Sequence, residues 1–373
     1  MDGNDFLVFI GAYTRSDGLG IGVARFDADT GTLTTPELAV ELANPSFVAL
    51  NPSLSHLYAV TEIDDYEGNV SGALSSFAVD RTSGELTFLN RQPTNGPGPC
   101  FVNVDARGQN AVVANYNGGS VAVLPINADG SLNPPSDFVQ HEGGAGVVSD
   151  RQEGPHAHSV NLDLETSRVY INDLGLDRIK SYELDSSTGK LTPAGLDVEL
   201  HPGAGPRHFD FHPDGKHAYA INELDNTITT MDYDRAAGRL TPVQTVSALP
   251  EGWSGRSSCA DLHISPNGRF IYGSNRGHDS IVIYAIHTTT GRLEYVGHES
   301  TRGNSPRNFA IEPSGRYLLA ANQDTDNIIV FEIDSDSGKL TASGTGVSVS
   351  MPVCLKLVPT AKYTATTTDF HVR

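Results

Sequence analysis

Apolar and polar positions alternate along most of the chain, and short polar segments interrupt this alternation at regular intervals. Seven such segments follow or approach the pattern D-x-x-x-G-x-L-T, with glycines at positions 31, 84, 130, 189, 238, 291 and 338. Because glycine adopts positive φ at no steric cost, each segment is typical of a hairpin turn. The glycines are 46 to 59 residues apart, which suits four short strands. We therefore predict an all-β fold, a seven-bladed β-propeller of four-stranded antiparallel blades.

A second recurring unit lies between these turns. Shortly after a proline an apolar strand begins, and a turn and a second apolar strand with a polar end follow it. Six copies are complete, at residues 45–62, 99–116, 155–173, 206–223, 259–276 and 306–323. The seventh is split, with its first strand in 351–359 and its second in 5–14. We expect pairing of these terminal strands to close the ring and to remove exposed strand edges.

The split unit also predicts how the chain is divided. One β-propeller domain is expected to span residues 1–373, because the repeats cover nearly the whole chain and no linker separates them. The last blade is expected to be shared between about residues 5–14 and 330–358. Residues 359–373 are expected to form a polar tail or an outer strand.

Charge and composition narrow the possible partners. The formal net charge of -20 argues against nucleic acid or an anionic membrane as a partner, because its field repels phosphates. The amino-terminal residues have no basic stretch and too short an apolar run for a signal peptide, which favours a cytoplasmic protein.

The counts of 6 Lys, 19 Arg, 29 Asp and 16 Glu suggest an acidic protein adapted to high salt. The three cysteines have no C-x-x-C spacing and are expected to be small buried hydrophobes.

Polar residues at equivalent places of the repeats are the candidates for chemistry, because such places converge on one mouth of a propeller. Directly after the proline stand His156, Arg207 and Arg307. The second strands end at Glu62, Tyr116, Asp173, Glu223, Arg276 and Gln323. His156 and His158 are two residues apart, so they project from the same face of a strand.

Two interpretations of these residues stay open. The histidines could be structural or lie on the surface, and Arg207, Arg276 and Arg307 could simply balance the carboxylates around a polar channel. Alternatively, the arginines form a binding site for an anionic small molecule, because a guanidinium binds carboxylate or phosphate through two parallel hydrogen bonds.

The segments PHAHS, GPRHFDFHPDGKHAYAINEL, DLHISPNGRFIYGSNR and SPRNFAIEPSGRYLLAANQ resemble the seven-bladed propeller lactonase family. That family includes bacterial-type 6-phosphogluconolactonases and fungal carboxy-cis,cis-muconate cyclases, and the resemblance covers residues 5 to 358. It implies a channel-mouth site that maps to His156 or His158, Arg207, Glu223 and Arg276. Which of the two histidines matches is left open.

The resemblance implies a lactone hydrolase, most simply one that acts on the lactone of a sugar acid. We expect no cofactor and no metal, a small anionic lactone as partner, and substrate contacts from Arg307, Asp173, Glu62 and Gln323. The oligomeric state is left open. Three alternatives remain: a muconate-lactonising enzyme, a propeller that binds ligands or proteins without catalysis, and a metal-dependent lactonase that uses both histidines with Asp173 or Glu223.

Overall fold

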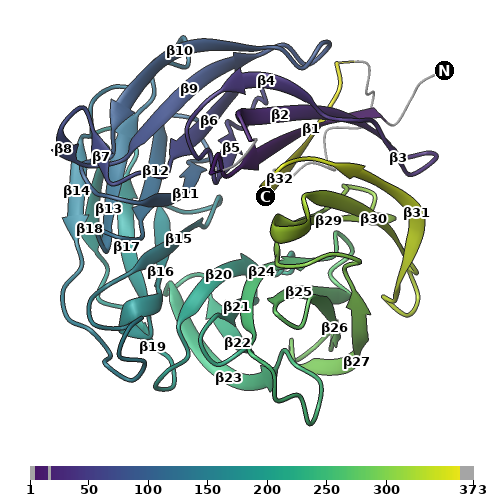
Figure 1. Ribbon diagram of the computed structural model, residues 1–373. Helices are drawn as coiled ribbons and strands as arrows, with labels where there is room; N and C mark the ends of the chain where they lie inside the picture. The colour runs from purple at the N-terminus through teal and green to yellow at the C-terminus, as the bar shows by residue number, and fades with distance from the viewer. Residues whose placement is uncertain (1–4, 16–17, 362–373) are drawn as a thin grey trace.

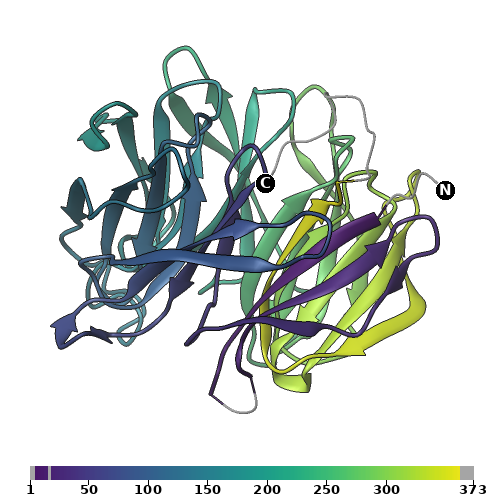
Figure 2. The same cartoon turned by 90° about the horizontal axis from the view of Figure 1, so that it is seen from above.

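The computed structural model of the protein describes residues 5–15 and 18–361. Seven antiparallel sheets surround a central axis (Figure 1), and in Figure 2 their strands run between the two faces of the ring. This confirms the predicted seven-bladed propeller.

Six of the sheets follow one another along the chain. The first contains β5 (Val48–Leu50), β6 (His56–Thr61), β9 (Ala73–Val79) and β10 (Leu86–Pro93). The second contains β11 (Pro99–Val104), β12 (Asn110–Asn115), β13 (Ser120–Pro125) and β14 (Asp137–Gln140). The third contains β15 (Ala157–Leu162), β16 (Arg168–Asp173), β17 (Arg178–Asp185), β18 (Lys190–Pro193) and the short β19 (Val198–Glu199).

The next three sheets repeat this arrangement. The fourth contains β20 (Pro206–Phe211), β21 (His217–Asn222), β22 (Thr227–Asp234) and β23 (Arg239–Ser247). The fifth contains β24 (Ser258–Ile264), β25 (Phe270–Arg276), β26 (Ser280–Ile286) and β27 (Leu293–Ser300). The sixth contains β28 (Pro306–Ile311), β29 (Tyr317–Asn322), β30 (Asn327–Ile333) and β31 (Leu340–Ser348). A small hairpin, β7 (Asp65–Tyr66) with β8 (Asn69–Val70), lies outside the seven sheets.

The seventh sheet closes the ring by pairing the two ends of the chain, as expected. Its strands are β32 (Pro352–Pro359), β1 (Asp5–Ala12), β2 (Gly20–Asp27), β3 (Thr32–Leu33) and β4 (Glu37–Glu41). Figure 1 shows β1, in purple, beside β32, in yellow, and Val8 pairs with Leu357. Arg81 of the first sheet adds a brace, because its Nε and Nη2 donate to the Pro359 carbonyl at 2.9 and 2.8 Å.

The expected bounds of this shared blade were wrong. It takes residues 5–41 and 352–359, whereas residues 330–348 belong to the sixth sheet as parts of β30 and β31. The reason is that the turn at Gly31 follows β2, so the amino-terminal region supplies every strand of the blade except the innermost. Pro359 ends β32, and residues 362–373 of the expected tail lie outside the described residues.

The seven polar segments are the turns between the third and fourth strands, and their glycines have φ between 62° and 88°. In the first of them, Asp27 Oδ1 accepts from the Asp29 amide at 2.8 Å and the Gly31 amide donates to the Asp27 carbonyl at 2.8 Å. An aspartate at the start and a glycine at the left-handed position therefore satisfy the turn locally. In the sixth segment His287 Nδ1 accepts from the amides of Thr289 and Thr290 and replaces the aspartate.

Tyrosines of the second strands connect neighbouring blades. The hydroxyls of Tyr58, Tyr170, Tyr219 and Tyr272 donate to the carbonyls of Gly130, Gly238, Gly291 and Gly338, respectively, in the turn of the next sheet. All four tyrosines are buried. The turn glycine thus both closes its own hairpin and accepts a hydrogen bond from the blade before it.

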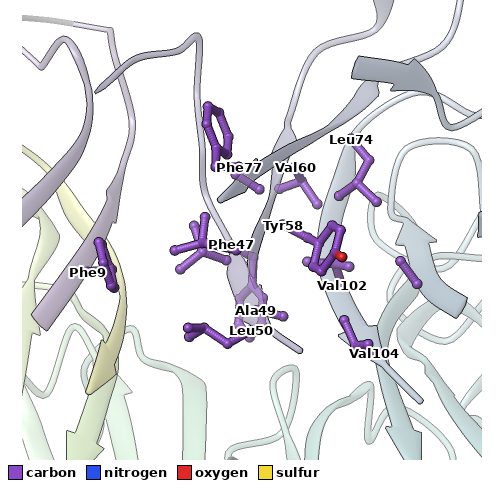
Figure 3. Packing of buried hydrophobic residues seen from close by; sticks show 14 of the residues in the cluster. Phe9, Phe47, Ala49, Leu50, Tyr58, Val60, Leu74, Phe77, Val102 and Val104 are labelled. Carbon is purple, nitrogen blue, oxygen red and sulfur yellow. The ribbon is translucent and has the colours of Figure 1, made fainter. Parts of the chain in front are cut away.

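The apolar cores lie between adjacent sheets. The cluster in Figure 3 joins Phe9 of the seventh sheet, Tyr58 and Phe77 of the first, and Val102 and Val104 of the second. Within the described residues the helices are two three-residue 3₁₀ turns, η1 (Leu174–Leu176) and η2 (Gln323–Thr325). No described helix is long and apolar enough to cross a membrane.

Candidate functional site

One mouth of the ring collects the residues that follow the prolines and the residues that end the second strands. In the fourth sheet Pro206 pairs with Asn222, so Arg207 at the start of β20 meets Glu223 after β21. In the fifth sheet Ser258 pairs with Arg276. The antiparallel register therefore produces the convergence that the repeats predicted.

Glu223 is the centre of this mouth. Its Oε2 accepts from Arg207 Nε at 2.9 Å and lies 3.0 Å from Arg276 Nη2, and its Oε1 accepts from Arg151 Nη2 at 2.6 Å. Burial alone would raise the pKa of this carboxyl, but Arg276, Arg207, His158 and Arg151 hold the pKa well below its usual value. Glu223 is therefore a permanent anion that organises three arginines from three different parts of the chain.

Arg207 is almost fully buried, with 2% of its surface exposed. Its Nη1 donates to the Ala260 carbonyl at 2.5 Å and to His208 Nε2 at 3.1 Å. Burial and the nearby Arg276 and Arg307 lower the pKa of Arg207 to about 10, so it stays a cation at neutral pH. Nη2 of Arg207 has no hydrogen-bond acceptor within residues 5–15 and 18–361.

Arg276 is fixed in a similar way. Its Nη2 donates to the Cys259 carbonyl at 2.9 Å in addition to its ion pair with Glu223, and Nε lies 3.4 Å from the Ser258 carbonyl. Its Nη1 finds no acceptor in the described part of the chain. Each of the two arginines thus keeps one NH₂ group available for a ligand.

The two histidines of PHAHS have different surroundings. His158 is buried, and its Nδ1 lies 4.0 Å from Cys100 Sγ. Burial, Arg207 and His208 hold the pKa of His158 well below its usual value, so the ring is neutral at pH 7. His158 Nε2 has no hydrogen-bond partner among the described residues. His156 instead uses Nδ1 on the Tyr116 carbonyl at 3.0 Å and stacks on the Tyr116 ring at 4.6 Å.

Arg307 contributes a further cation. Its guanidinium carbon lies 5.3 Å from the centroid of the Tyr13 ring, and no hydrogen bond or ion pair joins this guanidinium to any described residue. The Tyr13 hydroxyl donates to both carboxylate oxygens of Glu62, at 3.0 and 3.1 Å. Burial is the main cause that raises the pKa of Tyr13 to about 12, so the hydroxyl remains protonated.

The side chains of two predicted substrate contacts have partners outside the arginine cluster. Asp173 is buried and accepts from His141 Nδ1 at 2.6 Å and from the amides of His156 and Leu176, and in this way it caps η1. Gln323 begins η2, and its side chain donates to Asp324 at 2.9 Å. Neither side chain makes a hydrogen bond or ion pair with the arginines or with His158, because Asp173 caps η1 and Gln323 bonds to the Asp324 carboxylate within η2.

Sequence reasoning missed Tyr13 and Arg151, and it placed Tyr116 at the mouth without giving it a role. Tyr116 ends the second strand of its repeat, so its position was informative, and its hydroxyl accepts from Arg151 Nη2 at 3.0 Å. Arg151 belongs to the glycine-rich loop between β14 and β15, which carries no repeat signal. Tyr13 follows β1, where the split of the seventh repeat hides its equivalence to Tyr116.

The residues of the metal-dependent alternative do not form one ligand set, because Asp173 and Glu223 are held by other partners. In the described chain the close group of possible ligands is His212, Asp214 and His217, on the turn between β20 and β21, away from the arginines. All three cysteines are buried and free, as predicted.

Comparison with known proteins decides the family. The family described as "Lactonase, 7-bladed beta-propeller" matches residues 7–357. The chain belongs to this lactonase family. It is 38% identical to a 6-phosphogluconolactonase of Bacillus subtilis, over 95% of this chain and 98% of that protein. A 6-phosphogluconolactonase of Formosa agariphila is 36% identical over 82% of this chain and 86% of that protein. The structure of a periplasmic gluconolactonase of Pseudomonas aeruginosa matches with a TM-score of 0.90 and 33% identity, over 95% and 99% of the two chains.

Proposed function

We propose that the protein hydrolyses the lactone of a phosphorylated sugar acid, as 6-phosphogluconolactonases do by name. The observation that carries this proposal is the pair of unused NH₂ groups on Arg207 and Arg276, which are both held by Glu223. They share the mouth with the neutral ring of His158, whose pKa the charge of Arg207 lowers. Lactone hydrolysis needs an activated water and a stabilised tetrahedral oxyanion. These three side chains supply both functions in one mouth.

In the proposed reaction His158 is the base. Its neutral Nε2 takes a proton from water as the water oxygen bonds to the lactone carbonyl carbon. The negative charge on the carbonyl oxygen is stabilised by Arg207 Nη2 and Arg276 Nη1. As the ring C–O bond breaks, the imidazolium returns the proton to the departing ring oxygen, and the open acid forms. Glu223 keeps both arginines in place and takes no proton, because its pKa is held well below its usual value.

We assign the substrate's anionic group to Arg307. In a protein of net charge -20, an anion must be held by local contacts, and a guanidinium without a carboxylate partner offers its full set of donors. Tyr13 and Glu62 support Arg307 through the cation–π contact and the hydroxyl–carboxylate bonds. Glu62 thus acts on the substrate only through these neighbours.

The direct test is to offer the purified protein 6-phosphogluconolactone, gluconolactone and muconolactone and to follow acid release above the spontaneous rate. We expect the phosphorylated lactone to be the best substrate, and we expect Arg307→Gln to raise KM for it while leaving gluconolactone turnover unchanged. Equal kcat/KM for both sugar lactones would contradict the phosphate assignment. Cyclisation of muconates without sugar-lactone hydrolysis would favour the cyclase alternative, and no reaction at all would favour a binding propeller.

A further inference from the structure

His208 lies directly behind Arg207, on the side away from the mouth. The ring accepts from Arg207 Nη1 at 3.1 Å through Nε2, and Nδ1 lies 2.6 Å from Asp261 Oδ1. Arg207, His208 and Asp261 are 2%, 7% and 2% exposed, respectively, so these bonds are largely shielded from bulk water. The three side chains form one buried line from the mouth into the channel.

The chemistry of the partners defines the proton positions on His208. A guanidinium only donates, so Nε2 must be the unprotonated nitrogen, and Nδ1–H must donate to the Asp261 carboxylate. Burial and the positive charge of Arg207 lower the pKa of His208 to about 4, which keeps the ring neutral near pH 7. A protonated ring would set an N–H against the Nη1 donor.

Asp261 is itself held firmly by groups from two blades. Its Oδ1 also accepts from the Leu262 amide at 3.0 Å, and its Oδ2 accepts from the Phe309 amide at 3.2 Å and from Asn308 Nδ2. His263 Nε2 lies 3.0 Å from the same oxygen. Asp261 therefore has little freedom to move, and its hydrogen bond to Nδ1 holds the His208 ring in one orientation.

We propose that His208, held by Asp261, is a positioning residue that fixes Arg207 for the reaction. Three of the five N–H donors of Arg207 are anchored: one on Glu223, one on Ala260 and one on His208. The anchors on Nε and Nη1 define the plane of the guanidinium, and Nη2 is left pointing to the ligand. This inference rests on the proposed function, since it assigns the reaction to the arginine that is held.

The ring also forms part of the floor of the site. It makes edge contacts with Phe101 at 5.3 Å and with His158 at 5.4 Å between ring centroids. Beyond it lies a cavity of about 380 Å³, which extends to the far ends of the inner strands at Pro52 and Pro213. His208 therefore lies between the mouth and this cavity, and in this proposal it acts on the ligand through Arg207.

The test compares two substitutions at this position. His208→Phe keeps an aromatic ring of slightly larger size but removes both nitrogens. We expect kcat to fall about ten- to hundredfold with KM nearly unchanged, because a displaced Arg207 stabilises the transition state less well. His208→Gln offers an amide oxygen to Arg207, and we expect it to recover most of the lost kcat. His217→Phe is the matched control, because its Nδ1 makes a 2.8 Å bond to Asp214 at the distant turn; wild-type kcat is expected.

A second measurement does not depend on turnover. ¹⁵N NMR of labelled wild-type protein near pH 7 should show His208 as the neutral Nδ1–H tautomer. An imidazolium, or an Nε2–H tautomer, would overturn the inference, as would full kcat in a folded His208→Phe protein. If wild-type protein hydrolyses no lactone while the tautomer is as expected, the proposed function fails and the positioning geometry stands.

Discussion

Arg151 and Glu223 are 72 positions apart, and Arg151 Nη2 donates a 2.6 Å hydrogen bond to Glu223 Oε1. The other carboxylate oxygen of Glu223, Oε2, pairs with Arg207 and Arg276. One carboxylate thus pairs with cations from the β14–β15 loop and from two neighbouring blades. Because Arg151 is about one-third exposed and the other two arginines are more buried, removing the carboxylate charge leaves the inner cations without a counter-ion.

The first prediction concerns Glu223→Gln. We expect a loss of unfolding free energy of about 3 kcal/mol, because breaking a buried ion pair leaves uncompensated charge, and a fall in kcat of about a hundredfold, because both arginines lose their anchor. Urea unfolding and steady-state kinetics measure the two effects. Glu199→Gln is the control: its ion pair with Arg178 is long and exposed, so a change within about 0.5 kcal/mol is expected.

The buried ion pairs of Glu223 also predict how the stability of the protein depends on pH. The pKa of Glu223 is lower in the folded protein than its ordinary value of 4.5. Its contribution is therefore fully present above that ordinary value and is lost as the pH falls towards the folded pKa. The difference in unfolding free energy between wild type and Glu223→Gln should be constant from neutral pH down to about pH 5 and should shrink below it. A difference that grows on acidification would contradict the ion-pair assignment.

The third prediction separates the two histidines. With its pKa held well below 6.5, His158 stays unprotonated in mildly acidic solution, so the acid limb of kcat should lie clearly below pH 6.5. His158→Gln should lower kcat about a hundredfold or more, the usual loss for a missing general base. His156→Gln should mainly change KM, since His156 supports Tyr116. A larger kcat loss at His156 than at His158 would reverse the assignment.

The sequence predicted more of the fold than of the site. The D-x-x-x-G segments and the split seventh repeat were sufficient for the ring, because local turns and strand register define a propeller. The same register brought Arg207 to Glu223. Arg151 could not be predicted, because it lies in an irregular loop without a repeat equivalent. Asp173 and Glu223 occupy equivalent repeat positions, but the chain after Asp173 turns into η1 and uses the carboxylate as a cap.

The fourth prediction tests the bonds between blades. Tyr219→Phe removes the hydroxyl that donates to the Gly291 carbonyl at 2.7 Å and leaves a buried acceptor without its donor. We expect a loss of about 1 to 2 kcal/mol in unfolding free energy with kcat unchanged. Tyr295→Phe is the control, because Tyr295 is 59% exposed and its hydroxyl bonds to His298 on the surface. Equal losses for the two variants would mean that the bond between blades adds nothing.

The last prediction concerns salt. With a net charge of -20, repulsion among surface carboxylates destabilises the compact state, and dissolved salt screens it within a Debye length of about 3 Å at 1 M. The ion pairs around Glu223 are buried and are screened much less. We therefore expect the melting temperature to rise with KCl through the molar range while kcat for an uncharged lactone stays constant. Sodium chloride should act like KCl, since the effect is screening. A melting temperature that falls as salt is added would show that surface repulsion does not limit stability.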